Sequence, residues 1–237
     1  MKYYEKNGLH IAEVPAQDFQ VILVDEKKMS IGNNRCNGGF FGSFSESGEA
    51  FTLPVGHLVC DYAAKSKWTE FYCKQRGKFQ GGKFRFDSGA WSYGNPFYGK
   101  AQSTLVIKDG AASIQDLRHA PDGCSYAIAG VPIMRNGEDV KFATYVRGQG
   151  WDGSTLYGTW HIFVGIKAST ASTVYVMAMK TSTGNMILSA EAYRKFKVMG
   201  FWDVIKLDGG GSFYFNAGGR KKFTAENRRV CTILNLG

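Results

Sequence analysis

The sequence predicts an α+β fold, namely a β-rich, mixed-sheet single domain with few helices. Its 237 residues are 44% hydrophobic and 21% charged, which supplies enough apolar side chains for a core. The 30 glycines and 14% aromatic residues, beside 5 prolines, are typical of short strands joined by tight turns. No linker, repeat or shift in composition divides the chain, so we expect one domain over residues 1–237.

Short apolar segments bounded by turn residues predict the strands. These segments are Leu9–Val14, Phe19–Val24, Leu58–Tyr62, Thr104–Ile107, Tyr126–Met134, His161–Ile166, Thr173–Met179, Val204–Leu207, Phe213–Phe215 and Val230–Leu236. Tight turns are expected at the Asp-Gly pair of residues 109–110 and the Asn-Gly pair of residues 136–137, because these residue types tolerate positive φ.

One helix is expected from about Met186 to Met199. Gly200 follows it as a left-handed C-cap, and one face of the helix carries Leu188, Ala192, Phe196 and Met199. The segment Lys65–Gln75 has a weaker helical pattern, and a second helix there is left open.

The charge balance indicates an anionic partner. Lys and Arg number 29 against 20 Asp and Glu, a net charge of +9. Lys78-Phe79 and the segment Lys83–Phe86 alternate cations with aromatic rings, which is typical of single-strand binding. No nucleic-acid module accompanies them, so the sequence argues against nucleic acid.

The cysteines and the apolar segments restrict cofactors and location. The cysteines match no zinc-ligand spacing with the histidines, so we expect no metal or other cofactor and reduced, mostly buried thiols at Cys36, Cys60, Cys73, Cys124 and Cys231. Neither Met1–Ile11 nor Trp160–Met179 is a continuous apolar run. We therefore expect no membrane partner and a cytoplasmic or virion-associated protein.

Two glycine clusters carry the chemical prediction. Residues 37–41 read Asn-Gly-Gly-Phe-Phe and place a side-chain amide beside two residues that let backbone approach a ligand. Residues 208–212 read Asp-Gly-Gly-Gly-Ser and follow a predicted strand. Three successive glycines can turn their N–H groups toward one anion, with a carboxylate and a hydroxyl beside it. The alternative is a flexible hairpin loop.

Several motifs, taken in order, resemble those of the phosphodiester glycosidase family, which has bacterial and phage members. They are the clusters at residues 37–41 and 204–212, the segments 127–137 and 228–230, and Gly184 ahead of the predicted helix. The resemblance covers roughly residues 9–236. It implies a mixed α+β domain and an enzyme that hydrolyses the bond between a sugar anomeric carbon and a phosphodiester oxygen.

The resemblance leads to specific site assignments. Asp208 is the predicted carboxylate that activates water or stabilises an oxocarbenium-like centre. Asn37 would orient a sugar hydroxyl or phosphate oxygen, and His161 would supply an acid or a positive charge. Substrate and phosphate binding is assigned to Gly38, Gly39, Gly209, Gly210, Gly211, Ser212 and Arg229.

Two departures from the family pattern leave a second function open. His161 stands where the family has an arginine, and Phe213 replaces a second serine, which we expect to make the edge of the site more apolar. The alternative function is a non-catalytic protein that captures a phosphorylated sugar, a nucleotide or a teichoic-acid-like polymer.

Each assigned side chain also has a structural interpretation. Asp208 could cap the turn that it begins, and Asn37 could hydrogen-bond its own turn. His161 could be a satisfied core histidine. Arg229 could form an exposed ion pair near Glu226. His57 and His119 follow no motif and are expected in loops or on the surface.

Overall fold

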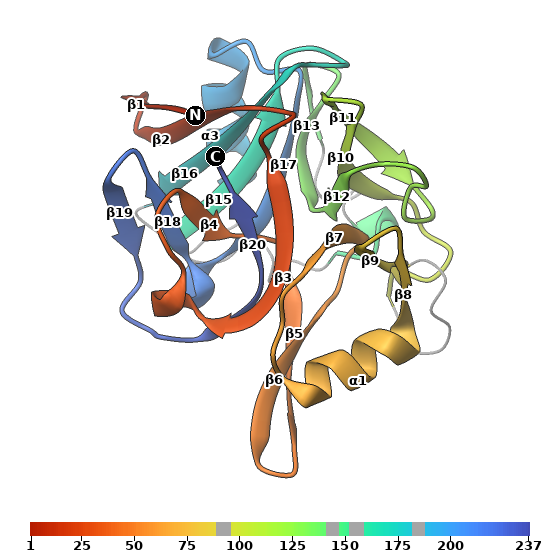
Figure 1. Cartoon of the computed structure of the whole chain (residues 1–237). Helices are drawn as coiled ribbons and strands as arrows, with labels where there is room; N and C mark the ends of the chain where they lie inside the picture. Colours follow the sequence, from red (N-terminus) through yellow and green to blue (C-terminus); the bar gives the residue numbers. More distant parts are fainter. Residues whose placement is uncertain (89–95, 141–146, 152–158, 182–187) are drawn as a thin grey trace.

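The computed structural model describes residues 1–88, 96–140, 147–151, 159–181 and 188–237. Within these ranges most residues belong to two large sheets, from which a two-stranded arm projects (Figure 1). The arm pairs β5 (Phe41–Glu46) with β6 (Glu49–Pro54).

The first sheet has seven strands and is antiparallel along its described pairs. Its order is β1 (Lys2–Lys6), β2 (Leu9–Pro15), β16 (Thr173–Lys180), β15 (Trp160–Ile166), β17 (Asp203–Gly209), β13 (Val131–Arg135) and β14 (Glu138–Asp139).

The second sheet has eleven strands and is mixed, because β3 and β7 pair in parallel. Its main order is β11 (Ala111–Leu117), β10 (Gln102–Lys108), β12 (Tyr126–Ala129), β7 (Leu58–Tyr62), β3 (Gln20–Lys27), β20 (Arg229–Asn235), β4 (Arg35–Asn37), β18 (Tyr214–Ala217) and β19 (Arg220–Phe223). The hairpin of β8 (Gly77–Gln80) and β9 (Lys83–Phe86) joins it through β7.

The main hydrophobic core lies between the two sheets. Alternate residues of each strand point into it because successive side chains of a strand face opposite sides. From β15 they are Ile162 and Val164, from β17 Ile205 and Leu207, and from the facing β3 Val21 and Leu23.

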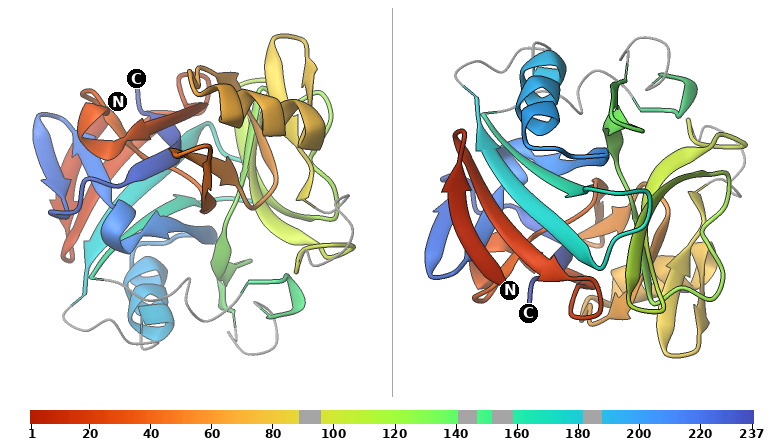
Figure 2. Two further views of the ribbon diagram at one scale, coloured as in Figure 1. Left: turned by 90° about the horizontal axis from the view of Figure 1, so that it is seen from below. Right: turned by 90° about the horizontal axis from the view of Figure 1, so that it is seen from above.

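The other face of the seven-stranded sheet is covered by α3 (Leu188–Val198), as Figure 2 shows. Ala192 and Phe196 of this helix join a second hydrophobic cluster with Phe163 of β15 and Val204 of β17. Gly200 follows the helix with φ 73°, as a left-handed C-cap requires. The expected helix is therefore confirmed from residue 188 onward, while Gly184 and residues 186–187 lie outside the described ranges.

A second helix, α1 (Lys67–Arg76), forms where the sequence left the question open. Ser66 caps it by accepting a hydrogen bond from the Thr69 amide. The helix packs on the arm, where the rings of Tyr72 and Phe51 stack with centroids 5.4 Å apart.

The predicted fold class is confirmed, and every predicted strand overlaps an observed one. The turns at Asp109-Gly110 and Asn136-Gly137 have the expected positive φ at all four residues. The strands that the apolar pattern missed are those with exposed or polar residues: β1, β4, β5, β6, β8, β9, β11, β14 and β19. The cysteines are free, and four are buried. In the described ranges no helix has the length and hydropathy needed to cross a membrane.

The predicted strand Tyr126–Met134 is in fact two strands in different sheets, separated by Gly130. The chain crosses from one sheet to the other at this residue and runs close to β17. A Cβ atom on Gly130 would lie 2.5 Å from the Lys206 carbonyl oxygen, which is backbone and cannot move aside cheaply. Glycine is therefore required here for close approach and not for a positive φ.

We predict that Gly130→Ala lowers the free energy of unfolding by about 1–3 kcal/mol, the usual cost of overpacking. Urea denaturation of both proteins measures the difference. Gly148→Ala is the matched control, because a Cβ atom on Gly148 would meet no atom of the described residues within 4 Å. Equal losses in the two variants would show that contact with β17 is not the reason for the glycine.

Candidate functional site

The two glycine clusters meet where β4 and β17 terminate. Asn37 Nδ2 donates to the Asp208 carbonyl oxygen at 2.9 Å, and Asn37 Oδ1 accepts from the Tyr214 amide at 2.9 Å. The Asp208 amide donates to the Gly38 carbonyl at 3.0 Å. The buried Asn37 side chain therefore joins the seven-stranded sheet, which contains Asp208, to the eleven-stranded sheet, which contains Tyr214.

The glycines after Asn37 pack directly on β20. The Gly38 and Gly39 amides donate to the carbonyl and the side-chain oxygen of Thr232, at 2.8 and 2.9 Å. A Cβ atom on Gly38 would lie 2.7 Å from Thr232 Oγ1. Both amides assigned to a substrate thus have a partner within the protein, and Gly38 has a packing reason to be glycine.

A β-bulge precedes the second glycine cluster. Phe163 pairs with Lys206 and His161 with Gly209, so β17 advances three residues while β15 advances two. An extra residue of this kind bends a strand and redirects its side chains. Asp208 lies within the bulge.

The Asp208 carboxylate is half-buried and held by its own turn. It accepts hydrogen bonds from the Gly209 amide and the Ser212 hydroxyl. Burial raises the pKa of the Asp208 carboxyl above its ordinary value, although those two hydrogen bonds and the cations Lys206 and Arg228 act in the opposite direction. These contacts agree with the interpretation that Asp208 caps the turn that it begins. They also hold its carboxylate within the bulge.

Lys206 is a buried cation two residues before Asp208. Its exposed fraction is 1%, and its ammonium donates to the Leu207 carbonyl at 2.9 Å and lies 4.7 Å from the centroid of the Phe40 ring. Burial lowers the pKa of Lys206 to about 8, against the attraction of Asp208. This residue was not among those predicted for the site.

A signal for Lys206 does exist in the sequence. The predicted strand Val204–Leu207 is otherwise apolar, and Lys206 interrupts it on the same face as Val204. A lysine at an inward position of an apolar strand, two residues before a carboxylate, is the pattern that would have indicated Lys206 as a site residue.

His161 is buried, as its core interpretation predicted. Its Nε2 atom lies 3.4 Å from Thr181 Oγ1, and its ring lies near that of Phe163, with centroids 6.2 Å apart. Its backbone touches the glycine cluster, because a Cβ atom on Gly209 would lie 3.2 Å from His161 Cα and 2.5 Å from the Trp160 carbonyl.

The arginine beside the glycine cluster is Arg228 and not the predicted Arg229. Arg228 and Glu226 are the side chains that a Cβ atom on Gly211 would meet, and these two side chains lie 4.0 Å apart. Arg229 points elsewhere: its guanidinium donates to the Asp25 carbonyl and lies 3.5 Å from Asp25 Oδ1. The two arginines are adjacent in sequence, but Arg229 is the first residue of β20 and pairs with Lys27 of β3, whereas Arg228 precedes the strand.

Asp25, which holds Arg229, is a structural carboxylate. It is buried and accepts hydrogen bonds from the Thr52 and Thr69 hydroxyls, both at 2.7 Å. These bonds connect β3 with the arm and α1, so Arg229 belongs to that junction.

The carbonyl side of the glycine cluster is held by a second buried lysine. Lys28 Nζ donates to the Gly211 carbonyl at 2.7 Å and to Thr224 Oγ1 at 2.5 Å. Gly210 has φ 56°, a conformation that favours glycine. The cluster forms a short 3₁₀ turn (Gly210–Ser212) held by these contacts.

Phe213 does not line the edge of the site, contrary to expectation. Its side chain is buried in the core between the sheets and stacks on Trp160 with ring centroids 4.8 Å apart. Phe213 therefore anchors the end of the 3₁₀ turn in the core between the sheets.

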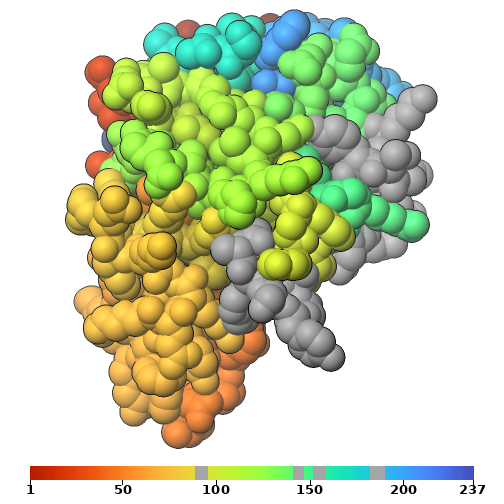
Figure 3. Space-filling model, turned by 90° about the vertical axis from the view of Figure 1, so that its right-hand side faces the viewer, coloured from red at the N-terminus to blue at the C-terminus, as the bar shows by residue number. Residues whose placement is uncertain are grey.

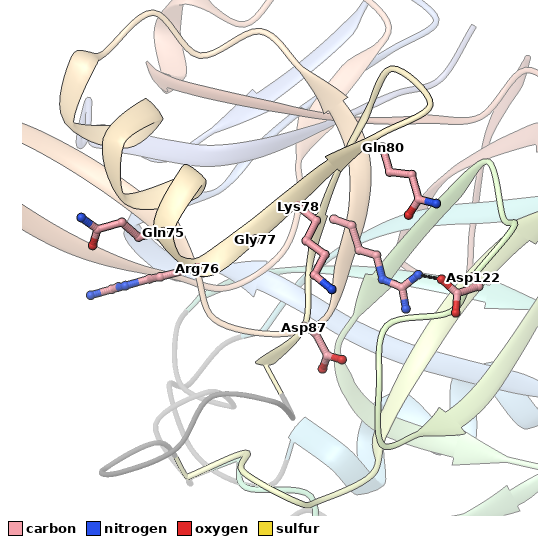
Figure 4. A pocket seen from close by; sticks show the side chains of 8 residues that line it. Gln75, Arg76, Gly77, Lys78, Gln80, Asp87 and Asp122 are labelled. Carbon is pink, nitrogen blue, oxygen red and sulfur yellow. Dashed lines mark hydrogen bonds and ion pairs between the residues drawn. The ribbon is translucent and has the colours of Figure 1, made fainter.

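A separate hollow of about 440 Å³ lies between α1, the β8–β9 hairpin and the loop that holds Asp122 (Figures 3 and 4). Its cations are largely matched by acids: Arg85 is paired with Asp122, and Lys78 points toward Asp87.

Of the neighbouring rings, Phe79 is exposed, whereas the rings of the segment Lys83–Phe86 do not favour base stacking. Phe84 and Phe86 are buried core residues, and Lys83 is paired with Asp61 at 2.6 Å. The alternation of cations and rings in this segment is therefore the alternation of an ordinary half-buried strand.

His57 lies in a loop, as expected, but is buried. Its Nε2 atom is 3.1 Å from the Leu117 carbonyl, and its Nδ1 atom is 3.4 Å from Asp87 Oδ1. Asp87 also lies 3.0 Å from the exposed His119.

We predict that Asn37→Ala destabilises the protein without any ligand present. The substitution leaves the Asp208 carbonyl and the Tyr214 amide without their partner, at about 1–3 kcal/mol for each buried group. Urea denaturation measures the loss. A variant as stable as the wild type would mean that Asn37 does not join the sheets.

The low pKa of Lys206 predicts a pH-dependent difference between the wild type and Lys206→Met. Between about pH 8 and 10.5 the unfolded lysine keeps a proton that the folded one has lost. Stability rises with pH where the unfolded state binds more protons. The free energy of unfolding of the wild type, minus that of the variant, should therefore increase by up to about 1.4 kcal/mol per pH unit. Denaturation curves across this range test it, and a constant difference would contradict it.

Comparison with known proteins finds similarity in structure alone. No family model matches the sequence, and no curated protein matches it. Among solved structures, the catalytic domain of zebrafish N-acetylglucosamine-1-phosphodiester α-N-acetylglucosaminidase, auto-inhibited by its pro-peptide, superposes with a TM-score of 0.58 and 16% identity, over 99% of this chain and 80% of that one.

A hypothetical protein from Synechocystis gives a TM-score of 0.49 and 10% identity, over 99% of this chain and 60% of that one. At these identities the comparison with the zebrafish domain establishes a shared fold, and the relationship is a distant one.

Proposed function

We propose that this chain is a hydrolase that cleaves the bond between a sugar anomeric carbon and a phosphodiester oxygen. The observation that carries the proposal is Asp208, a half-buried carboxylate fixed where the two sheets meet, with the cations Lys206 and Arg228 acting on it. Support also comes from the fold, which is shared with the catalytic domain of an enzyme named for a sugar-1-phosphodiester.

In the proposed reaction Asp208 accepts a proton from the water that attacks the anomeric carbon. The bond from that carbon to the phosphate oxygen breaks, and its electron pair leaves with the phosphate. A phosphodiester is a better leaving group than an alkoxide, so the reaction needs charge stabilisation more than a strong acid. The buried Lys206 ammonium near the carboxylate supplies that stabilisation without reorganising.

The substrate class follows from the charge of the chain and of the site. A net charge of +9 attracts anions. We therefore propose an anionic sugar phosphate or a nucleotide-like molecule as the substrate. A protein that only binds such a molecule is the competing proposal, and turnover separates the two.

We predict that Asp208→Asn reduces hydrolysis of N-acetylglucosamine-1-phosphate methyl ester by about 10²-fold or more, because the variant lacks the base. In the wild type, kcat/KM should fall on the acid side with a midpoint above 3.8, the ordinary aspartate value, since activity is lost as pH falls through a raised pKa. Release of reducing sugar from a series of sugar-1-phosphodiesters provides the measurement.

The control is Asp109→Asn, which removes an equal charge from an exposed turn where asparagine is well tolerated. It should leave the rate unchanged. Equal rates for the wild type and Asp208→Asn would exclude Asp208 as the base. Saturable binding of the ester without product at high protein concentration would favour the binding protein.

A further inference from the structure

Two buried hydrogen-bond donors lie against the ring of Phe40. Lys206 approaches it from β17, with the ammonium 4.7 Å from the ring centroid. Trp151, which is 3% exposed, approaches from the segment 147–151, with its ring centroid 5.2 Å from that of Phe40. Phe40 itself is half-buried and follows the Asn37–Gly39 bend.

The Lys206 ammonium is incompletely satisfied. It has three N–H donors, and its hydrogen bond to a described residue is the one to the Leu207 carbonyl. Asp208 attracts it, yet no carboxylate of the described residues lies within ion-pair distance of it. A buried cation without a bound counter-charge is costly, and proteins seldom retain one without a use.

The Trp151 indole N–H is also buried and has no acceptor among the described residues. A buried indole N–H usually finds an acceptor, so this one calls for an explanation. An anion that contacts both groups would accept their hydrogen bonds and neutralise the ammonium. A water molecule would satisfy the hydrogen bonds alone.

We propose that Lys206 and Trp151 form an anion subsite beside Phe40 that receives the phosphate oxygens of the substrate. The identity of the bound anion as a substrate phosphate rests on the proposed function. In that function the phosphate contacts these two side chains as well as glycine amides of the 208–212 cluster. The subsite would hold the leaving phosphate close to Asp208, which is two residues from Lys206 along β17. Charge-assisted hydrogen bonds to phosphate are the strong kind, which suits a group that gains charge in the reaction.

The test is a titration of the ¹⁵N-labelled protein with inorganic phosphate and then with dimethyl phosphate, followed through the indole N–H signals in ¹H–¹⁵N correlation spectra. The chain has 5 tryptophans, and Trp151→Phe identifies the Trp151 signal by its loss. We expect a saturable shift of that signal in the wild type. Lys206→Met should weaken binding by about tenfold or more, whereas Lys206→Arg keeps the charge and should retain most of it.

Lys108→Met is the control, because it removes an equal charge from an exposed position at the end of β10 and should leave the titration unchanged. A wild-type Trp151 signal that does not move, as a site filled by water would give, overturns the subsite. So does a shift that is the same in Lys206→Met. The spectrum of each variant reports its folding in the same experiment.

This titration is independent of turnover. Asp208→Asn should still shift the Trp151 signal with phosphate, since that variant keeps both donors. Phosphate binding without hydrolysis of any ester would retain the subsite and overturn the glycosidase proposal. Hydrolysis that depends on Asp208, with no effect of phosphate on the Trp151 signal, would retain the glycosidase proposal and overturn the subsite.

Discussion

The side-chain amide of Asn37 is the interaction on which the site depends. Its two ends bind the last carbonyl before the triple glycine and the first amide of β18, and these belong to different sheets. A buried amide is stabilising only when both of its ends have partners. The position of Asp208 therefore follows from the docking of the sheets, and the carboxylate is fixed before any ligand arrives.

Around this junction the chain places three cations: Lys206 and Lys28, which are buried, and Arg228, which is exposed. Lys206 is on β17, Lys28 follows β3, and Arg228 precedes β20. The glycines allow the strands and these side chains to approach closely, since Gly38, Gly209 and Gly211 would each clash if they carried a Cβ atom. The cluster thus builds a rigid frame for a carboxylate. This view replaces the anion-cradle hypothesis for Gly38, Gly39 and Gly209, because their amides already have partners within the protein.

The sequence predicted what local patterns control. Apolar runs located buried strands in both sheets, such as β15 and β20, and Asn-Gly and Asp-Gly located two turns with their conformations. It missed strands such as β5 and β19, whose exposed faces lack an apolar pattern. It also exchanged Arg229 for Arg228, because Asp25, the partner that holds Arg229, is 204 positions distant in the sequence. Lys206 was missed for a related reason: its surroundings include the ring of Phe40, which only the fold brings to it.

The most direct measurement is a crystal structure of Asp208→Asn with an intact sugar-1-phosphodiester. Our account predicts that the sugar lies with its anomeric carbon facing residue 208 and that the phosphate oxygens are within hydrogen-bond distance of Lys206. A ligand bound elsewhere on the molecule, or one with its phosphate turned away from the junction of β4 and β17, would contradict it.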